Sequence, residues 1–313
     1  MARFRRRGRR ARPAPAVPLL LALAAVTVTV IVGGCSAGGG AEASRDVPAP
    51  VAALAPVSNA ERSLLHDAEQ TLIRHCMSRH GFTVRKVPEH PLPEQRDFPY
   101  VVDDVAWARE HGYGSELERR ARALRDTDPN RRYSRSLGAE RRAEAMDALH
   151  GRQRNALTVT LPSGAEVGRS DEGCTAGAEK ELYADLAAWF RAEAVTQALS
   201  GLRRSQVIAD PAYTGAVRAW SACMNRRGLH HPDPAAARAR FLDAPGNATP
   251  TEERRTAVAE AECALSSGLS GTAGRLSSRY GDALKAEHHS AFRERDRLQR
   301  AALPRARAIV GND

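Results

Sequence analysis

Two copies of a short cysteine motif constrain the fold of this 313-residue chain more than any other feature. Residues 74–82 and 221–229 share the pattern Cys-Met-x-Arg-x-Gly followed by an apolar residue, and each copy stands at the predicted end of a helix. One more cysteine follows each copy in a helical segment, Cys174 after the first and Cys263 after the second. The sequence therefore predicts two related helical units, each with its own pair of cysteines.

The four cysteines of these units, Cys76, Cys174, Cys223 and Cys263, are expected to form two disulfides. Disulfides persist in oxidising compartments outside the cytoplasm, and this chain begins with the export signal described below. Four cysteines allow three pairings. We favour Cys76 with Cys174 and Cys223 with Cys263, since each bond would join the two helices of one unit.

The positions of the motifs also divide the chain. We predict a first unit at residues 58–200 and a second unit at residues 201–313, which ends in a long helix. The first unit contains an insertion, about residues 98–167, that the second lacks. Within it, residues 156–167 alternate around a Pro-Ser-Gly turn, as a hairpin does. The expected fold is mainly α, a helical bundle built from two disulfide-stapled repeat units, with a small β-hairpin in the insertion.

Helix boundaries are indicated by capping residues. A serine or threonine followed three residues later by glutamate is typical of a capping box, and an aspartate before a proline is typical of a helix start. Capping boxes are predicted at Ser58, Ser115 and Thr249, and aspartate caps at Asp210 and Asp233. Apolar periodicity predicts further helices over residues 139–150, 173–199 and 271–302.

The start of the chain has the three parts of an export signal. Seven arginines precede an apolar stretch over residues 19–32, and small residues then lead to Cys35. The apolar stretch is too short to span a bilayer, which takes about 20 helical residues. Val32-Gly33-Gly34-Cys35 resembles a bacterial lipobox, which implies that residues 1–34 are removed and that Cys35 carries acyl chains such as palmitate. The alternative is a secreted protein cut nearby, with Cys35 lost or left free.

Residues 35–57 are rich in glycine, alanine, serine and proline. Such a segment buries too little apolar surface to offset the entropy of ordering it, so we expect a flexible tether. With lipid on Cys35, the tether would hold the folded part at the outer face of the cytoplasmic membrane.

The basic charge of the chain lies mainly in its leader. Removal of the seven arginines in residues 1–34 lowers the formal net charge from +10 to +3. A mature chain this close to neutral gives no case for nucleic-acid binding, which usually needs a concentrated basic face. An acidic partner, such as anionic lipid headgroups, is compatible with this charge but is not required by it.

Motifs for known chemistry are missing from the sequence. The chain has no Gly-x-Ser-x-Gly elbow, His-Glu-x-x-His pair, P-loop or dinucleotide fingerprint. His75 and His80 share a predicted helix, but they would need further ligands to hold a metal ion. Residues 126–130 resemble the start of a calcium-binding loop. The glycine and the glutamate that such a loop needs further on are replaced by Arg131 and Leu137. We therefore expect no metal and no cofactor.

Four aromatic residues cluster early in the insertion: Phe98, Tyr100, Trp107 and Tyr113. Aromatic side chains are enriched in binding sites, which makes these four candidates for contact with a ligand. The alternative, which we favour, is that they staple the insertion to the helical core.

Two functions are compatible with these features. A binding or interaction module of the cell envelope, with an envelope protein or a small ligand as partner, needs only an apolar groove or patch. A hydrolase of envelope material would need titratable groups that face the aromatic cluster, for which Asp103, Asp104, Glu110 and His111 are the candidates. Because no catalytic motif is present, we expect the binding module and assign no catalytic residue.

Short segments in both units resemble a family of uncharacterised actinobacterial secreted or lipid-anchored proteins. In the first unit they are Phe98-Pro99-Tyr100, residues 103–109, Gly112-Tyr113-Gly114, residues 161–164, Gly173-Cys174 and Leu182-Tyr183. In the second unit they are Trp220, Cys223-Met224, Gly228 and residues 259–263. The resemblance covers nearly the whole mature chain and implies no activity, cofactor or catalytic residue.

Overall fold

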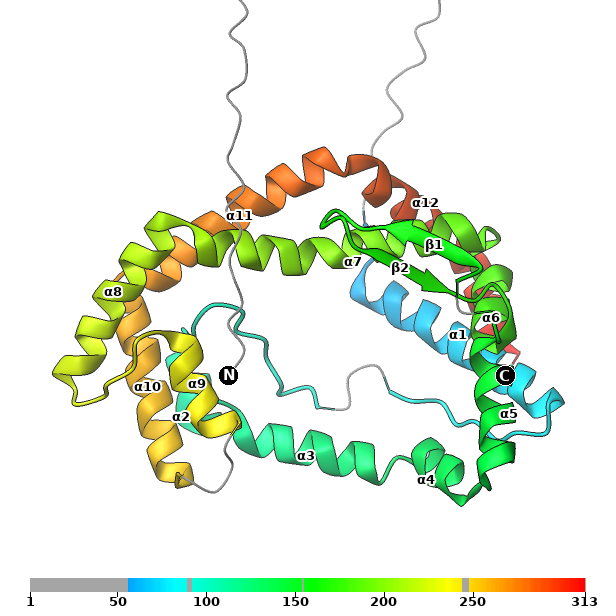
Figure 1. Cartoon of the computed structure of the whole chain (residues 1–313), viewed down its shortest axis with the longest axis horizontal. Helices are drawn as coiled ribbons and strands as arrows, with labels where there is room; N and C mark the ends of the chain where they lie inside the picture. The colour runs from blue at the N-terminus through cyan, green and yellow to red at the C-terminus, as the bar shows by residue number, and fades with distance from the viewer. Residues whose placement is uncertain (1–55, 89–91, 154, 244–247, 313) are drawn as a thin grey trace, which may run out of the picture. The chain divides into compact units, whose positions relative to one another are not determined.

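The computed structural model describes residues 56–88, 92–153, 155–243 and 248–312. Within these ranges it has 12 helices and one two-stranded antiparallel sheet, which confirms the expected mainly helical fold with a small hairpin (Figure 1). The predicted signal peptide, Cys35 and residues 35–55 of the predicted tether lie outside the described residues.

No helix in the described ranges combines the length and the apolar character that a membrane crossing requires.

The elements of the first half, up to the hairpin, are α1 (Asn59–Arg79), α2 (Val105–His111), α3 (Ser115–Asp126), α4 (Pro129–Ser136), α5 (Ala139–His150), β1 (Leu157–Thr160) and β2 (Glu166–Arg169). The remaining helices are α6 (Gly173–Tyr183), α7 (Leu186–Ala209), α8 (Pro211–Arg226), α9 (Pro234–Leu242), α10 (Pro250–Ser266), α11 (Leu269–Glu287) and α12 (His289–Gly311). In the hairpin, Val159 pairs with Val167, and the antiparallel register extends from Leu157 opposite Arg169 to Thr160 opposite Glu166.

Both copies of the cysteine motif end a helix in the same way. The backbone N–H of Phe82 donates to the carbonyl of Met77 at 2.9 Å, and that of Leu229 donates to the carbonyl of Met224 at 3.0 Å. The glycine that precedes each donor has a positive φ, the left-handed conformation that this closing turn requires. The repeat seen in the sequence is therefore also a repeat of local structure.

Both disulfides have the favoured pairing. Cys76–Cys174 joins α1 to α6, and Cys223–Cys263 joins α8 to α10. Cys174 and Cys263 are fully buried, so each bond lies against the core of its helix pair. The prediction that each bond links the two helices of one repeat is confirmed.

The helices pack in two groups. One, which we call the α1 group, contains α1, α5, α6 and α12, and the other, the α10 group, contains α2, α8, α9 and α10. The helices α7 and α11 lie side by side, and each contacts helices of both groups (Figure 1). The insertion is therefore shared between the groups, because α2 packs against α10 and α5 packs against α6.

The predicted boundary between residues 200 and 201 falls inside a helix. The 24 residues of α7 run without a break, and they bury Trp189 in the α1 group and Val207 in the α10 group. One helix thus serves two cores, which explains why no boundary occurs there. Likewise α12, which the sequence assigned to the second unit, packs on α1, α6 and α7.

The last residue of the predicted tether, Val57, is part of the fold. Val57 is only 4% exposed and packs in the same apolar cluster as Leu65 and Leu303. Its carbonyl accepts a hydrogen bond from the side chain of Arg62 at 3.2 Å. Because Val57 can bury its side chain against α12, it belongs to the folded part.

Most predicted helix starts are confirmed. The capping boxes at Ser58 and Thr249 and the aspartate caps at Asp210 and Asp233 form as expected. The box at Ser115 is wrong, since this residue is the first of α3 and donates its hydroxyl to a carboxylate on α10.

Two long predicted helices are each broken into two. The segment over residues 173–199 breaks at Ala184, where φ is 68°, and Asp185 then caps α7. The segment over residues 271–302 breaks at His288, which stands between α11 and α12.

Candidate functional site

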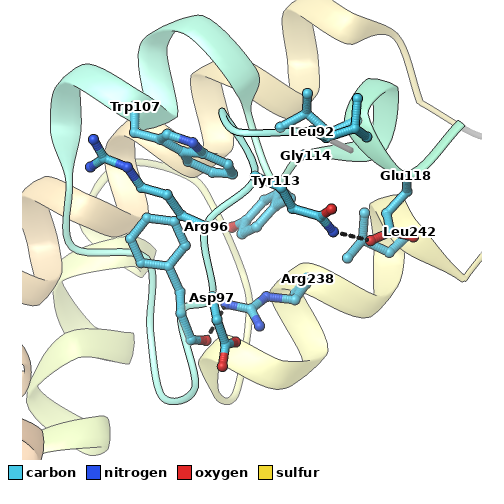
Figure 2. A pocket seen from close by; sticks show the side chains of 12 residues that line it. Leu92, Arg96, Asp97, Trp107, Tyr113, Gly114, Glu118, Arg238 and Leu242 are labelled. Atoms are coloured by element: carbon cyan, nitrogen blue, oxygen red, sulfur yellow. Dashed lines mark hydrogen bonds between the residues drawn. The ribbon is translucent and has the colours of Figure 1, made fainter. Parts of the chain in front are cut away.

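A pocket lies where the insertion meets the α10 group. Its volume is about 480 Å³, and three of the four candidate aromatic residues, Phe98, Trp107 and Tyr113, line it. Figure 2 shows Trp107 and Tyr113 at the pocket together with Arg238 and Leu242, which come from α9. The other lining residues are Leu92, Gln95, Arg96, Asp97, Gly114, Leu117 and Glu118.

Trp107 is held in place by its own helix and by the preceding loop. Asp104 caps α2 by accepting the backbone N–H of Trp107 at 2.9 Å, and the indole N–H donates to the carbonyl of Glu94 at 3.1 Å. The ring lies 4.8 Å from that of Phe98, measured between centroids. With 7% of its surface exposed, Trp107 is fixed before any ligand arrives.

The ring of Tyr113 lines the pocket, whereas its hydroxyl points into the core. The ring stacks on Phe241, with centroids 5.2 Å apart and planes inclined by 19°. The hydroxyl donates to the carboxylate of Glu260 at 2.6 Å. Because that hydroxyl is already bonded in the core, Tyr113 contributes apolar surface rather than a hydrogen-bonding group.

Two buried carboxylates on α10 position this part of the insertion. Glu260 accepts the backbone N–H of Val102 at 2.9 Å as well as the hydroxyl of Tyr113. Glu253, seven residues earlier, accepts the backbone N–H groups of Tyr113 at 2.9 Å and Ser115 at 3.0 Å. The two acids therefore anchor both ends of the segment that carries Trp107.

Burial also changes the pKa of Glu260 and of Tyr113. Removal from water raises the pKa of Glu260 to about 7, although the hydrogen bonds from Tyr113 and Val102 lower it in part. Burial, together with the nearby charge of Glu260, raises the pKa of Tyr113 well above its usual value. Neither Glu253 nor Glu260 lines the pocket, so these acids support the site and are not placed to react with a ligand.

The polar side of the pocket carries groups of both signs. Arg238 donates to the carbonyl of Phe98 at 2.7 Å, and Gln95 donates to Glu118 at 3.2 Å. Arg96 forms an ion pair with Asp104. Asp97 is exposed and makes no hydrogen bond or ion pair with any residue that the structure describes. It is therefore available to a ligand.

Tyr100, the fourth candidate, belongs to a different place. It lines a separate hollow of about 280 Å³ together with Tyr213 and Arg238. Its hydroxyl donates to Ser277 at 3.2 Å, and its carbonyl accepts the hydroxyl of Tyr213 at 3.2 Å. The structure therefore brings three of the four aromatic candidates together and leaves Tyr100 apart.

The four candidate groups for hydrolysis do not converge on the pocket. Asp103 accepts the hydroxyl of Ser270 at 2.5 Å, and Asp104 caps α2. Glu110 is exposed, and His111 packs its ring 5.2 Å from that of Trp107. None of the four lines the pocket.

Within the described part of the chain, one group of side chains has the spacing of a metal site. It consists of Cys76, His80 and Cys174. Both sulfurs of this group are joined in the disulfide, so they are not thiolates that could bind an ion. The absence of a metal in the function remains a prediction from the sequence.

The supporting residues Glu253, Glu260 and Arg238 were not predicted from the sequence. The two acids stand seven residues apart, the spacing of one helix face, and alanines on the same stretch are buried with them. A carboxylate on an apolar helix face is a usable signal of a buried anchor. Arg238 carries no such signal, because its contact with Phe98 joins residues 140 positions apart.

The chain matches no protein-family model, no curated protein and no solved structure. The family resemblance noted in the sequence therefore stays a prediction, and the function has to be argued from the geometry of the site.

Proposed function

We propose that this protein is a lipid-anchored binding module of the cell envelope and that the pocket beside Trp107 takes its ligand. The pocket itself carries the proposal. Its volume of about 480 Å³ is in the range of sites for small molecules. Fixed aromatic rings line one part of it and charged groups another, which is the usual composition of a specific binding site.

The lining favours a small ligand with one apolar face and a polar edge. Trp107, Phe98 and Leu117 supply the apolar contact. Asp97 and Arg238 supply one charge of each sign, so the pocket does not select for a net charge. The aromatic residues also bury most of their surface in the core, so the stapling role and the binding role fall on the same side chains.

The membrane anchor is argued from the leader and the lipobox-like Cys35. It places the pocket at the outer face of the cytoplasmic membrane, with secretion as the alternative. Mass spectrometry of the mature N-terminus tests this part of the proposal, because acylation of Cys35 is expected and an unacylated start elsewhere would contradict it. No observation favours the hydrolase, since none of its four candidate groups lines the pocket.

Photo-crosslinking in intact cells tests the binding role. A photoreactive phenylalanine analogue replaces Gln95 at the pocket or Arg293, an exposed residue on α12, as the control position. We expect an adduct at position 95 that position 293 does not give. Asp97→Ala should weaken the adduct, while Asp282→Ala, a surface change on α11, should not. Identical adducts at both positions would contradict the proposal.

A further inference from the structure

A second hollow lies between α2, the end of α8 and α10. Its volume is about 510 Å³, and four arginines line it: Arg109, Arg227, Arg254 and Arg255. Apolar side chains, including Leu229 and Val258, and no acidic residue complete the lining. All four arginines are exposed, so their guanidinium groups are accessible from solvent.

The positive charge of this hollow is largely uncompensated. Arg227 forms an ion pair with Glu262. By contrast, Arg109, Arg254 and Arg255 form no ion pair or hydrogen bond with any residue that the structure describes. The acids beside them on α10 have other partners, since Glu252 lies 3.7 Å from Arg240 and Glu253 holds Ser115.

The repeat provides an internal comparison for this charge. Arg227 and Leu229 occupy the motif positions that His80 and Phe82 occupy in the first copy, and those two residues also line a hollow, of about 560 Å³. There the two arginines are paired, Arg141 with Glu144 at 2.7 Å and Arg152 with Asp147 at 3.0 Å. Both copies thus form a hollow at the same place, and only the second leaves arginines without an acidic partner, three of its four.

We propose that the arginine hollow binds an organic phosphate, with the phosphate on the guanidinium groups and the apolar part of the ligand over Leu229 and Val258. Guanidinium groups match phosphate oxygens with paired, charge-assisted hydrogen bonds. The positive charge of three unpaired arginines exceeds the one negative charge of a carboxylate. A phosphate ester carries up to about two negative charges near pH 7 and neutralises more of it. The apolar floor favours an ester over the inorganic ion.

Calorimetric titration with hexyl phosphate tests this site on the full mature protein. Arg254→Gln combined with Arg255→Gln should weaken binding about tenfold or more, because two charged hydrogen-bond donors are lost. The matched control, Arg122→Gln with Arg125→Gln, removes two exposed arginines of α3 and should leave affinity within about twofold. Inorganic phosphate should bind more weakly than hexyl phosphate. A wild type that binds neither hexyl phosphate nor the phosphatidic acid vesicles described next would overturn the proposal.

Sedimentation with vesicles separates a lipid headgroup from a soluble ester as the source of the phosphate. The vesicles are phosphatidylcholine with or without phosphatidic acid. Binding that requires phosphatidic acid and is lost in the α10 variant but kept in the α3 variant would support the proposal and identify the headgroup. Equal loss of vesicle or ester binding in both variants would overturn it, because the effect would then be that of net charge alone.

The α10 variant should remain folded, since neither substituted side chain has a bond to lose. Thermal unfolding checks this point, and a transition no lower than that of the wild type is expected.

Discussion

Glu253 and Glu260 hold the segment that carries Trp107 and Tyr113 against α10. Their oxygens accept three backbone N–H groups and two hydroxyls from the insertion, all within a mostly apolar core. A buried carboxylate with all its partners fixes one geometry, because any other arrangement leaves charge unpaired and out of water. The shape of the pocket thus depends on residues that do not line it.

Glu260→Gln should make stability less dependent on pH. In the folded protein the pKa of Glu260 is raised to about 7 from an ordinary 4.5, so the folded state retains a proton that the unfolded state loses. The stability that Glu260 contributes is therefore present below about pH 4.5 and is lost as pH rises through 7. Burial also raises the pKa of Glu69 to about 7. Glu69 therefore adds to the loss of stability with rising pH in the wild type and in Glu260→Gln alike.

Urea unfolding at pH 5, 6, 7 and 8 measures this effect. The wild type should lose about 1–3 kcal/mol more unfolding free energy between pH 5 and pH 8 than Glu260→Gln does. Glu262→Gln, a change in an accessible acid of the same helix, should keep the wild-type slope. Parallel pH profiles for the wild type and Glu260→Gln would show that the buried carboxylate does not titrate as argued.

Gly112→Ala should destabilise the protein by more than backbone strain alone. Gly112 has φ +65°, and a Cβ there would lie 2.8 Å from the Cγ of Glu253. Gly164, with φ +83° and nothing within 4 Å, provides the matched control. Both alanines should cost stability through strain, and Gly112→Ala should cost about 1–3 kcal/mol more in chemical denaturation, because Glu253 must also move. Equal losses would mean that this close approach is not important.

At the level of elements, each disulfide fixes one pair of helices. Replacement of both cysteines of either pair by serine should lower the unfolding free energy by about 2–5 kcal/mol. Loss of Cys76–Cys174 should cost slightly more, by less than about 1 kcal/mol in a chain-entropy model, because its sequence separation is 98 rather than 40. Denaturant titration of both double variants checks this. A double variant as stable as the wild type would contradict a stabilising role for its disulfide.

Helix starts could be predicted where the signal is local. Ser58 and Thr249 bond to a glutamate three residues on, so a short stretch of sequence contains both partners. The same pattern at Ser115 failed because its hydroxyl and N–H bond to Glu253, 138 residues away. The local sequence does not show that Glu253 competes with Glu118 for the hydrogen bonds of Ser115.

At the level of the whole molecule, the sequence predicted parts of the site but not their assembly. The aromatic residues at 98, 107 and 113 were candidates because they lie close together in the chain. Arg238 and the two acids of α10 lie 138 or more positions away from their partners, and packing alone brings them together. The shared helix α7 was missed for a similar reason, since repeated motifs suggested two units where the cores are joined.

The N-terminal end of the folded part gives a prediction at the same scale. Val57 packs with α12 from the other end of the chain, so Val57→Ala should lower the unfolding free energy by about 1–2 kcal/mol. Val87→Ala, a change at an exposed valine, should have little effect. Thermal or chemical denaturation of both variants checks this. If Val57→Ala were as stable as the wild type, the tether would extend to residue 57 as the sequence suggested.

Native mass spectrometry of the mature protein extracted from membranes tests the lipid anchor and the binding pocket in one measurement. We expect a chain that begins at an acylated Cys35 and carries an additional non-covalent mass. That mass should be reduced in Asp97→Ala, which changes the pocket, and retained in Asp282→Ala, which does not. A wild-type protein without acyl chains, or with a bound mass that Asp97→Ala leaves unchanged, would contradict a lipid-anchored module that binds its ligand beside Trp107.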